Sequence, residues 1–177
     1  HHRTEEFEVV FTNMNERLKK VFQTKNPILT LVSSGTCAME AAVVNAFSPG
    51  DKVLVISTGV FGDRFVKIAS RYGLDVKVIN VPWGKGADPQ DIKEFLDSPE
   101  GQGVRGVFVT HNETSTGVAN PLESIGEIIK DNDCLYIVDA ISSMGGLEVK
   151  TDQWGIDIAI TGSQKALMLP PGLAFVS

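Results

Sequence analysis

The sequence of 177 residues is poor in the residues that build metal centres, disulfide frameworks and membrane spans. Its two cysteines and three histidines are too few and too scattered for a metal site, so no metal is expected. Cys37 and Cys134 lie among apolar residues, which predicts buried free thiols in a reducing cytosol. No apolar stretch approaches the ~20 residues of a membrane span. Because Glu5 and Glu6 also do not fit a signal peptide, we expect a cytoplasmic protein.

Basic charge is scarce as well. The chain has 16 lysines and arginines against 22 aspartates and glutamates, a formal net charge of −6. There is no basic stripe with interleaved aromatic residues, so a nucleic-acid partner is not expected. A hydrophobic content of 42% with 21% charged residues is typical of one globular domain with a good core.

Short apolar, β-branched runs alternate with helical patterns along the chain. Helical spacing after the possible cap Thr4 predicts a first helix that runs to about residue 24. Seven strands are predicted, at residues 28–32, 53–56, 76–81, 106–110, 134–138, 156–160 and 173–176. Four more helices are predicted between them, at residues 38–47, 61–72, 89–96 and 121–130.

This order of elements is typical of an α/β fold in which a mostly parallel, seven-stranded sheet has helices on both faces. The last two strands are joined by the short turn Pro170-Pro171-Gly172. Because such a turn is too short for a right-handed helical crossover, the seventh strand is predicted to run antiparallel.

Lys165 stands among small polar residues just after the predicted strand 156–160. Ligands of parallel sheets bind at the carboxyl ends of the strands, which is where this lysine falls. If it is desolvated there, it loses its proton more easily and becomes a nucleophile that can form a Schiff base with an aldehyde. The alternative is ordinary surface charge.

The segment Ser34-Gly35-Thr36 lies between the first predicted strand and the next helix. Small residues at a helix start leave N–H groups free for a phosphate, although a plain helix N-cap is the favoured interpretation of this segment alone. It lacks the lysine of a Walker A loop and the three glycines of a dinucleotide fingerprint. A Rossmann-type nucleotide domain is therefore disfavoured.

Three further residues follow other predicted strands, and each has a structural alternative. Asp139 ends the fifth strand and either caps a loop or acts, as an ionised carboxylate, on something bound above the sheet. Phe61, between two glycines, either covers a ligand or begins the core face of a helix, and the second is favoured for it alone. Ser115 lies in the polar loop 110–117 with His111. A Ser-His-Asp arrangement of Ser115, His111 and Asp139 is disfavoured because no nucleophile-elbow pattern supports it, and His111 is expected to be structural.

Together these segments predict phosphate donors, an aromatic plane, a carboxylate and a lysine at one edge of one sheet. Pyridoxal phosphate needs these four groups: a phosphate cup, a stacking ring, a partner for the pyridinium and an amine for the aldehyde.

The chain also resembles, over its whole length, the large domain of fold-type I pyridoxal-phosphate enzymes. The resemblance is to class V aminotransferases of the alanine–glyoxylate and serine–pyruvate group. It is carried most specifically by Ser34-Gly35-Thr36-Cys37-Ala38-Met39-Glu40-Ala41, Glu113-Thr114-Ser115-Thr116-Gly117, Val138-Asp139-Ala140, Gly162-Ser163-Gln164-Lys165-Ala166 and Pro170-Pro171-Gly172.

The resemblance implies a role for each candidate residue. Lys165 is the implied Schiff-base lysine, which moves the substrate's Cα proton, and Asp139 the partner of the pyridine nitrogen. Phe61 falls at the position of the stacked aromatic ring, and Ser115 in the loop that faces the cofactor's ring and phenolic oxygen. The implied phosphate cup consists of Ser34, Gly35, Thr36 and Gln164.

The implied reaction is amino transfer from alanine or serine to glyoxylate or pyruvate, in a homodimer with shared sites. Cysteine desulfurases, relatives of the same fold, carry histidines where this chain has Phe61 and Gln164, so a desulfurase is disfavoured. Other pyridoxal-phosphate chemistry (a lyase or hydrolase) and a cofactor-binding or assembly piece without turnover are the alternatives. The resemblance further implies that residues 1–177 form the large domain only. An N-terminal segment and a small C-terminal domain would lie outside them, so weak or no turnover is expected of this stretch alone.

Overall fold

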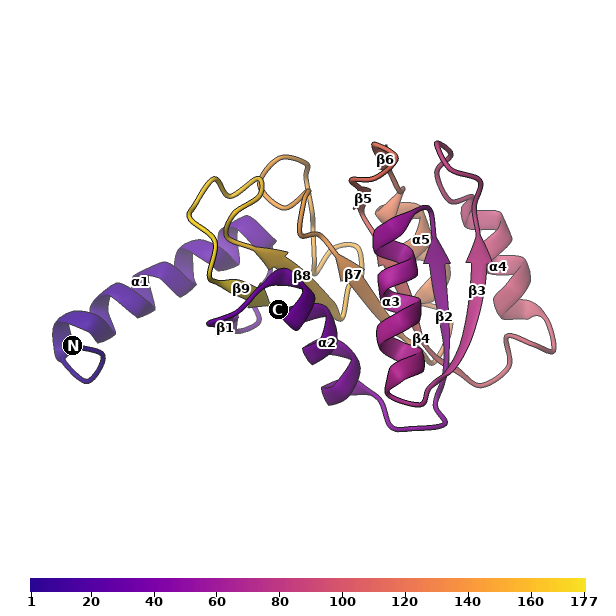
Figure 1. Cartoon of the computed structure of the whole chain (residues 1–177), viewed down its shortest axis with the longest axis horizontal. Helices are drawn as coiled ribbons and strands as arrows, with labels where there is room; N and C mark the ends of the chain where they lie inside the picture. Colours follow the sequence, from indigo (N-terminus) through magenta and orange to yellow (C-terminus); the bar gives the residue numbers. More distant parts are fainter.

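The computed structural model describes all residues from 1 to 177 as a twisted sheet with helices on both faces (Figure 1). The main sheet has seven strands in the order β1-β9-β8-β7-β4-β2-β3. Their bounds are β1 Leu29–Leu31, β2 Lys52–Ser57, β3 Asp75–Asn80, β4 Val104–Thr110, β7 Leu135–Asp139, β8 Ile158–Gly162 and β9 Ala174–Val176. Strands β2, β3, β4, β7 and β8 are mutually parallel, whereas β9 pairs antiparallel with both β8 and β1.

The two faces of the sheet bury separate hydrophobic clusters. Helices α2 (Gly35–Ala46) and α3 (Val60–Arg71) cover the face to which Val55, Phe108 and Ile137 contribute. Helices α4 (Pro89–Asp97) and α5 (Leu122–Ile129) cover the opposite face. The central strands are therefore buried on both sides, which is why their sequences are continuous apolar runs rather than alternating ones.

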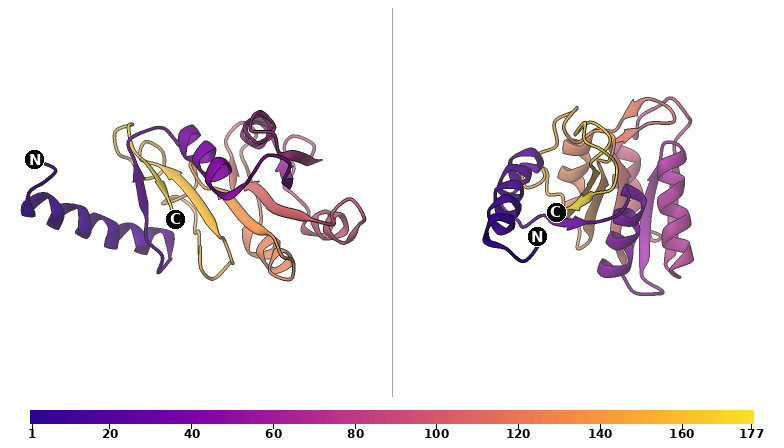
Figure 2. Two further views of the ribbon diagram at one scale, coloured as in Figure 1. Left: turned by 90° about the horizontal axis from the view of Figure 1, so that it is seen from below. Right: turned by 60° about the vertical axis from the view of Figure 1, so that its left-hand side comes forward.

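Helix α1 (Glu5–Phe22) begins at Thr4, whose hydroxyl accepts the N–H of Phe7 as an N-cap, and extends away from the domain (Figures 1 and 2). Leu18 and Phe22 join the hydrophobic cluster on the sheet face that also carries α4 and α5, but the apolar residues of the first half of α1 are largely exposed. Its predicted apolar face is thus only partly buried in this chain.

The predicted fold class, the seven-stranded sheet and the antiparallel last strand are confirmed. Two predictions were wrong. The polar stretch after β4 is not a plain loop, because β5 (Asn112–Glu113) and β6 (Val118–Ala119) form a small hairpin there. Cys37 and Cys134 are free but only half-buried, since each lies near an element end rather than in a core cluster.

The parallel strands bring the ends of β2, β4, β7 and β8 to one edge. Thr110 at the end of β4 pairs in register with Asp139 at the end of β7, and Asp139 pairs with Ile160 of β8. The turns that follow these strands therefore converge, and they contain the candidate residues.

The contact between α5 and the turn at Trp154 offers a test of this packing. Gly126 is buried, and a Cβ at this position would overlap the backbone carbonyl oxygen of Trp154. Although alanine favours helices by about 1 kcal/mol over glycine, we expect Gly126→Ala to lower the free energy of unfolding by about 1–3 kcal/mol through overpacking. Urea denaturation measures this. Ser124→Ala on the exposed side of α5 is the control and should leave the stability nearly unchanged.

Candidate functional site

Asp139 is the most buried of the candidate residues, with 3% of its surface exposed. Its Oδ1 accepts the backbone N–H of Ile141 at 2.9 Å, and Oδ2 accepts no hydrogen bond from the protein. Burial raises the pKa of Asp139 from 3.8 to about 6; the Glu113 carboxylate adds to the rise, while the Ile141 N–H and Arg64 oppose it. With a pKa of about 6 the group is mainly ionised at pH 7. One of its oxygens accepts no hydrogen bond from the protein, so burial favours a positive or proton-donating partner there.

Thr110 lies beside Asp139 in the register of β4 and β7. Its Oγ1 is buried and has no hydrogen-bond partner. Two polar atoms with unused hydrogen-bonding capacity therefore stand side by side at the strand ends, where most buried polar atoms of a folded protein would be satisfied.

The amino end of α2 provides free backbone donors. Ser34 is the N-cap, and its Oγ accepts the N–H of Cys37 at 3.4 Å. The N–H groups of Gly35 and Thr36 have no partner within the helix because first-turn amides lack a preceding carbonyl. Ser34 and Thr36 are exposed, so this end, with its positive partial charge, can bind an anion such as phosphate.

Phe61 begins α3 and is half-buried. The Arg64 guanidinium lies 4.7 Å from the centre of its ring, and the same side chain donates to Thr36 Oγ1 at 2.9 Å. Arg64 takes part in none of the ion pairs of the structure. It therefore joins the start of α2 to the aromatic ring of α3 and places between them a positive charge that is in no direct ion pair.

Two glycines, Gly35 and Gly162, allow α2 and the turn after β8 to approach the same side chains closely. A Cβ on Gly35 would lie 2.6 Å from Ile141 Cδ1, and one on Gly162 would lie 3.0 Å from Gln164 Oε1. The Ile141 side chain is near both glycines, because the Gly162 position is also 3.7 Å from Ile141 Cγ2. The structure thus brings the start of α2, the residue two after Asp139 and Gln164 together.

Lys165 lies in a turn that is closed by Ser163. The buried Ser163 hydroxyl donates to the carbonyl of Pro170 at 2.7 Å, and its N–H donates to the carbonyl of Leu173 at 3.0 Å. The Leu169 N–H donates to the Ser163 carbonyl at 2.9 Å. Of the two interpretations that the sequence left open for Lys165, desolvated or at the surface, the structure shows the second: Lys165 and its neighbour Gln164 are exposed.

Ser115 and His111 do not form a triad with Asp139. Ser115 Oγ donates to Glu113 Oε1 at 2.6 Å, whereas His111 Nδ1 is 2.9 Å from Ser143 Oγ. Burial lowers the pKa of His111 to about 4, so the ring is neutral. His111 is the structural residue that the sequence favoured.

The sequence analysis assigned no individual role to three residues of this region: Glu113, Arg64 and Ile141. Glu113 is fully buried beneath the start of α3, and Arg64 and Ile141 contact the candidate residues described above. The available signals were the acid within the polar segment after β4 and the position of Ile141 two residues after Asp139.

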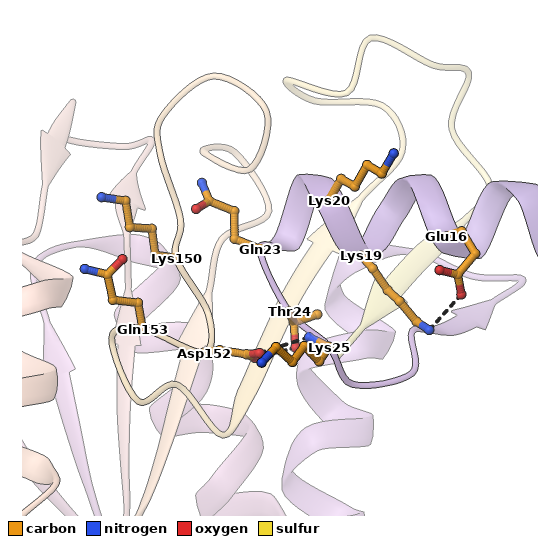
Figure 3. A pocket seen from close by; sticks show the side chains of 9 residues that line it. All are labelled: Glu16, Lys19, Lys20, Gln23, Thr24, Lys25, Lys150, Asp152 and Gln153. Atoms are coloured by element: carbon orange, nitrogen blue, oxygen red, sulfur yellow. Dashed lines mark hydrogen bonds and ion pairs between the residues drawn. The ribbon is translucent and has the colours of Figure 1, made fainter.

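A separate polar hollow of about 750 Å³ lies at the carboxyl end of α1 (Figure 3). Within it, Asp152 accepts hydrogen bonds from the Thr24 hydroxyl and the Lys25 N–H, which ties α1 to the turn after residue 150. None of the residues predicted for the site lines it. Its chemistry is that of a solvated junction between helix and turn.

The helices give no sign of a membrane span, since none combines the length and the apolar character that crossing a bilayer requires.

The raised pKa of Asp139 predicts a pH dependence of stability. Because the folded-state pKa of about 6 lies above the unfolded value of 3.8, the folded state holds the proton more tightly, and stability falls as the pH rises between these values. We expect Asp139→Asn to remove this fall. The stability of the variant relative to the parent chain should rise by up to about 3 kcal/mol between pH ~4 and pH ~7. Urea unfolding across this range measures the difference. The exposed Asp131→Asn should show no such trend, and a flat difference for Asp139→Asn would contradict the assignment.

Comparison with known proteins agrees with this geometry. The chain is 47% identical to an uncharacterized aminotransferase of Methanocaldococcus jannaschii over 99% of its own length and 45% of that protein. It is 40% identical to a serine–glyoxylate aminotransferase of Methylorubrum extorquens over 99% of its own length and 44% of the relative. The crystal structure of an alanine–glyoxylate aminotransferase from a Nostoc species superimposes with a TM-score of 0.94 at 37% identity, covering 99% of this chain and 46% of that one.

The chain thus spans slightly less than half the length of these relatives. The sequence model of the aminotransferase class-V family matches all of residues 1–177. This match over the whole chain, together with relatives that are 40–47% identical over 99% of it, shows that the chain belongs to the class-V aminotransferase family.

Proposed function

We propose that residues 1–177 are the cofactor-binding large domain of a pyridoxal-phosphate-dependent aminotransferase. The observation that carries the proposal is the buried Asp139, whose free Oδ2 lies at the same sheet edge as the open start of α2, Phe61 and Lys165. A buried carboxylate with a free oxygen fits a protonated pyridine nitrogen, because that partner neutralises the charge that burial makes costly.

The residues of the chain fit the remaining parts of this cofactor. The N–H groups of Gly35 and Thr36, with the hydroxyls of Ser34 and Thr36, would hold the phosphate at the positive end of α2. Gln164 reaches the same region through Gly162, and Phe61 offers a ring for stacking. Ser115 lies beside the start of α3, where its hydroxyl accepts the Val60 N–H at 3.0 Å.

When bound, pyridoxal phosphate supplies an aldehyde for an amine and a ring that takes up electrons from the substrate's Cα. Asp139 would keep the ring nitrogen protonated, so that electrons flow toward it. Lys165 Nζ would hold the cofactor at its aldehyde carbon when no substrate is bound. When a substrate amine takes that position, the freed Nζ would accept the substrate's Cα proton and deliver it to C4′, the aldehyde-derived carbon of the cofactor. Lys165 is exposed in the turn and can therefore meet both partners.

We propose amino transfer from alanine or serine to glyoxylate or pyruvate as the reaction of the whole protein. Support comes from the names of similar proteins, a serine–glyoxylate and an alanine–glyoxylate aminotransferase. The resemblance also predicts a homodimer in the cytoplasm. Phe61 and Gln164 stand where desulfurases of this fold have histidines, which favours amino transfer over sulfur removal.

Covalent labelling tests the lysine. The chain mixed with pyridoxal phosphate should absorb in the visible, and borohydride should bleach this band and fix one cofactor per chain. We expect Lys165→Ala to abolish the fixed label, because no other amine would lie at the cofactor's aldehyde. Intact-protein mass spectrometry measures it. Lys67→Ala, at an exposed position of α3, is the control and should be labelled like the parent chain. Equal labelling of Lys165→Ala would refute the assignment.

The substrate is tested separately, on the unreduced cofactor-loaded whole protein, because weak or no turnover is expected of residues 1–177 alone. Alanine or serine should convert the visible band to the absorption of pyridoxamine phosphate, with release of pyruvate or hydroxypyruvate. Because no amino group can be donated by a 2-oxo acid, glyoxylate alone should leave the band unchanged. If both amino acids leave the band unchanged while Lys165 is labelled, the chain binds the cofactor without this turnover.

A further inference from the structure

Glu113 is a fully buried carboxylate that accepts hydrogen bonds from four donors. Its Oε2 accepts the backbone N–H groups of Phe61 at 3.0 Å and Gly62 at 3.2 Å, at the start of α3. Its Oε1 accepts the Ser115 hydroxyl at 2.6 Å and the Ser115 N–H at 3.2 Å. One side chain of β5 therefore connects the helix that carries the aromatic ring to the turn that carries Ser115.

The chain leaves space for this bridge at Gly59. A Cβ there would lie 2.5 Å from Ser115 Oγ and 2.6 Å from Glu113 Cγ, so any larger residue would push the bridge apart. Gly59 has an extended backbone, φ 160° and ψ −155°, so left-handed strain is not the reason for glycine. The reason is the close approach of the Glu113 and Ser115 side chains.

The bridge also determines how Ser115 can interact. A hydroxyl has one proton and two lone pairs. The proton of Ser115 is donated to Glu113, and one lone pair accepts the Val60 N–H at 3.0 Å. Only one lone pair of the Ser115 hydroxyl remains. Toward a ligand, Ser115 therefore acts as a hydrogen-bond acceptor for as long as its hydroxyl donates to Glu113.

We propose that Glu113 is a positioning residue of the cofactor site, which fixes the ring of Phe61 through the start of α3 and fixes Ser115 as a hydrogen-bond acceptor. This inference rests on the proposed function. It adds to the proposed site a residue that would not touch the cofactor and would act through Phe61 and Ser115. The charge is essential, because both oxygens of a carboxylate accept, and all four surrounding groups donate.

Glu113→Gln keeps the shape and removes this match. The amide NH2 of glutamine must face either the two N–H groups of α3 or the two donors of Ser115. Two backbone amides of α3 donate on one side, whereas one backbone amide and a rotatable hydroxyl, both of Ser115, donate on the other. Because backbone amides cannot turn away, the glutamine oxygen should face the two amides of α3 and its NH2 should face Ser115. The Ser115 hydroxyl then rotates, and its proton points outward to the ligand. A single substitution thus changes Ser115 from acceptor to donor.

The test uses the chain with pyridoxal phosphate as the probe. We expect Glu113→Gln to weaken cofactor binding about tenfold or more and to shift the pH midpoint of the visible absorption band. Glu123→Gln, on the exposed side of α5, is the matched control and should change neither. Hydrogen exchange of the cofactor-free chain should show loss of protection of the Ser115 amide only in the Glu113 variant, because that amide loses its acceptor while those of α3 keep theirs.

Ser115→Ala keeps the hydrogen bonds that the N–H groups of α3 donate to Glu113. It provides the second variant if Glu113→Gln folds poorly. It should shift the pH midpoint, and the double variant should shift it no further than Ser115→Ala alone, because both changes act on one hydroxyl. Unchanged affinity and midpoint in Glu113→Gln would overturn the proposal and leave Glu113 as a helix cap. Absence of cofactor binding in the parent chain would overturn the proposed function as well, so the two failures are distinguishable.

Discussion

The parallel pairing of β2, β4, β7 and β8 is the constraint on which the rest of the molecule depends. In register, Thr110 lies beside Asp139 and Asp139 beside Ile160, so the turns after these strands leave the sheet at one edge. Close packing on both faces holds that register, because a slip by one residue would exchange the side chains that fit one packed face for those that fit the other. The candidate residues are separated by up to 131 positions, between Ser34 and Lys165, and meet only through this pairing.

Much of the fold and the site could be predicted because both depend on local patterns. Continuous β-branched runs identified the strands, and the short Pro170-Pro171-Gly172 turn identified the antiparallel last strand. Asp139 and Ser34 could be selected because Asp139 ends β7 and Ser34 directly precedes α2. The β5–β6 hairpin could not, since strands of two residues have no measurable periodicity. For helix α1, the spacing of apolar residues predicts the helix but not how much of its apolar face is buried.

What the sequence could not supply is the pairing of side chains across long separations. Glu113 bonds to amides 52 and 51 positions earlier, and Arg64 to Thr36, 28 positions away. Polar composition identifies a loop but not which of its members is buried. The exposure of Lys165 is a similar case, because it depends on how far the turn after β8 projects from the sheet edge. Electrostatics connect the same residues, because the Glu113 carboxylate raises the pKa of the buried Asp139 and the Arg64 guanidinium lowers it.

The bonds made by Ser163 have a consequence for the reach of Lys165. They fasten the turn where it leaves β8 and where it returns toward β9, so the two ends of the segment between Ser163 and Leu169 are held at a fixed separation. The Lys165 amine can then move only within the reach of one lysine side chain from a Cα atom that this segment restrains. Under the proposed function, a carbon that bonds to the amine must enter that volume. The buried Ser163 hydroxyl, which is not itself assigned to the site, thereby limits where such a carbon can stand.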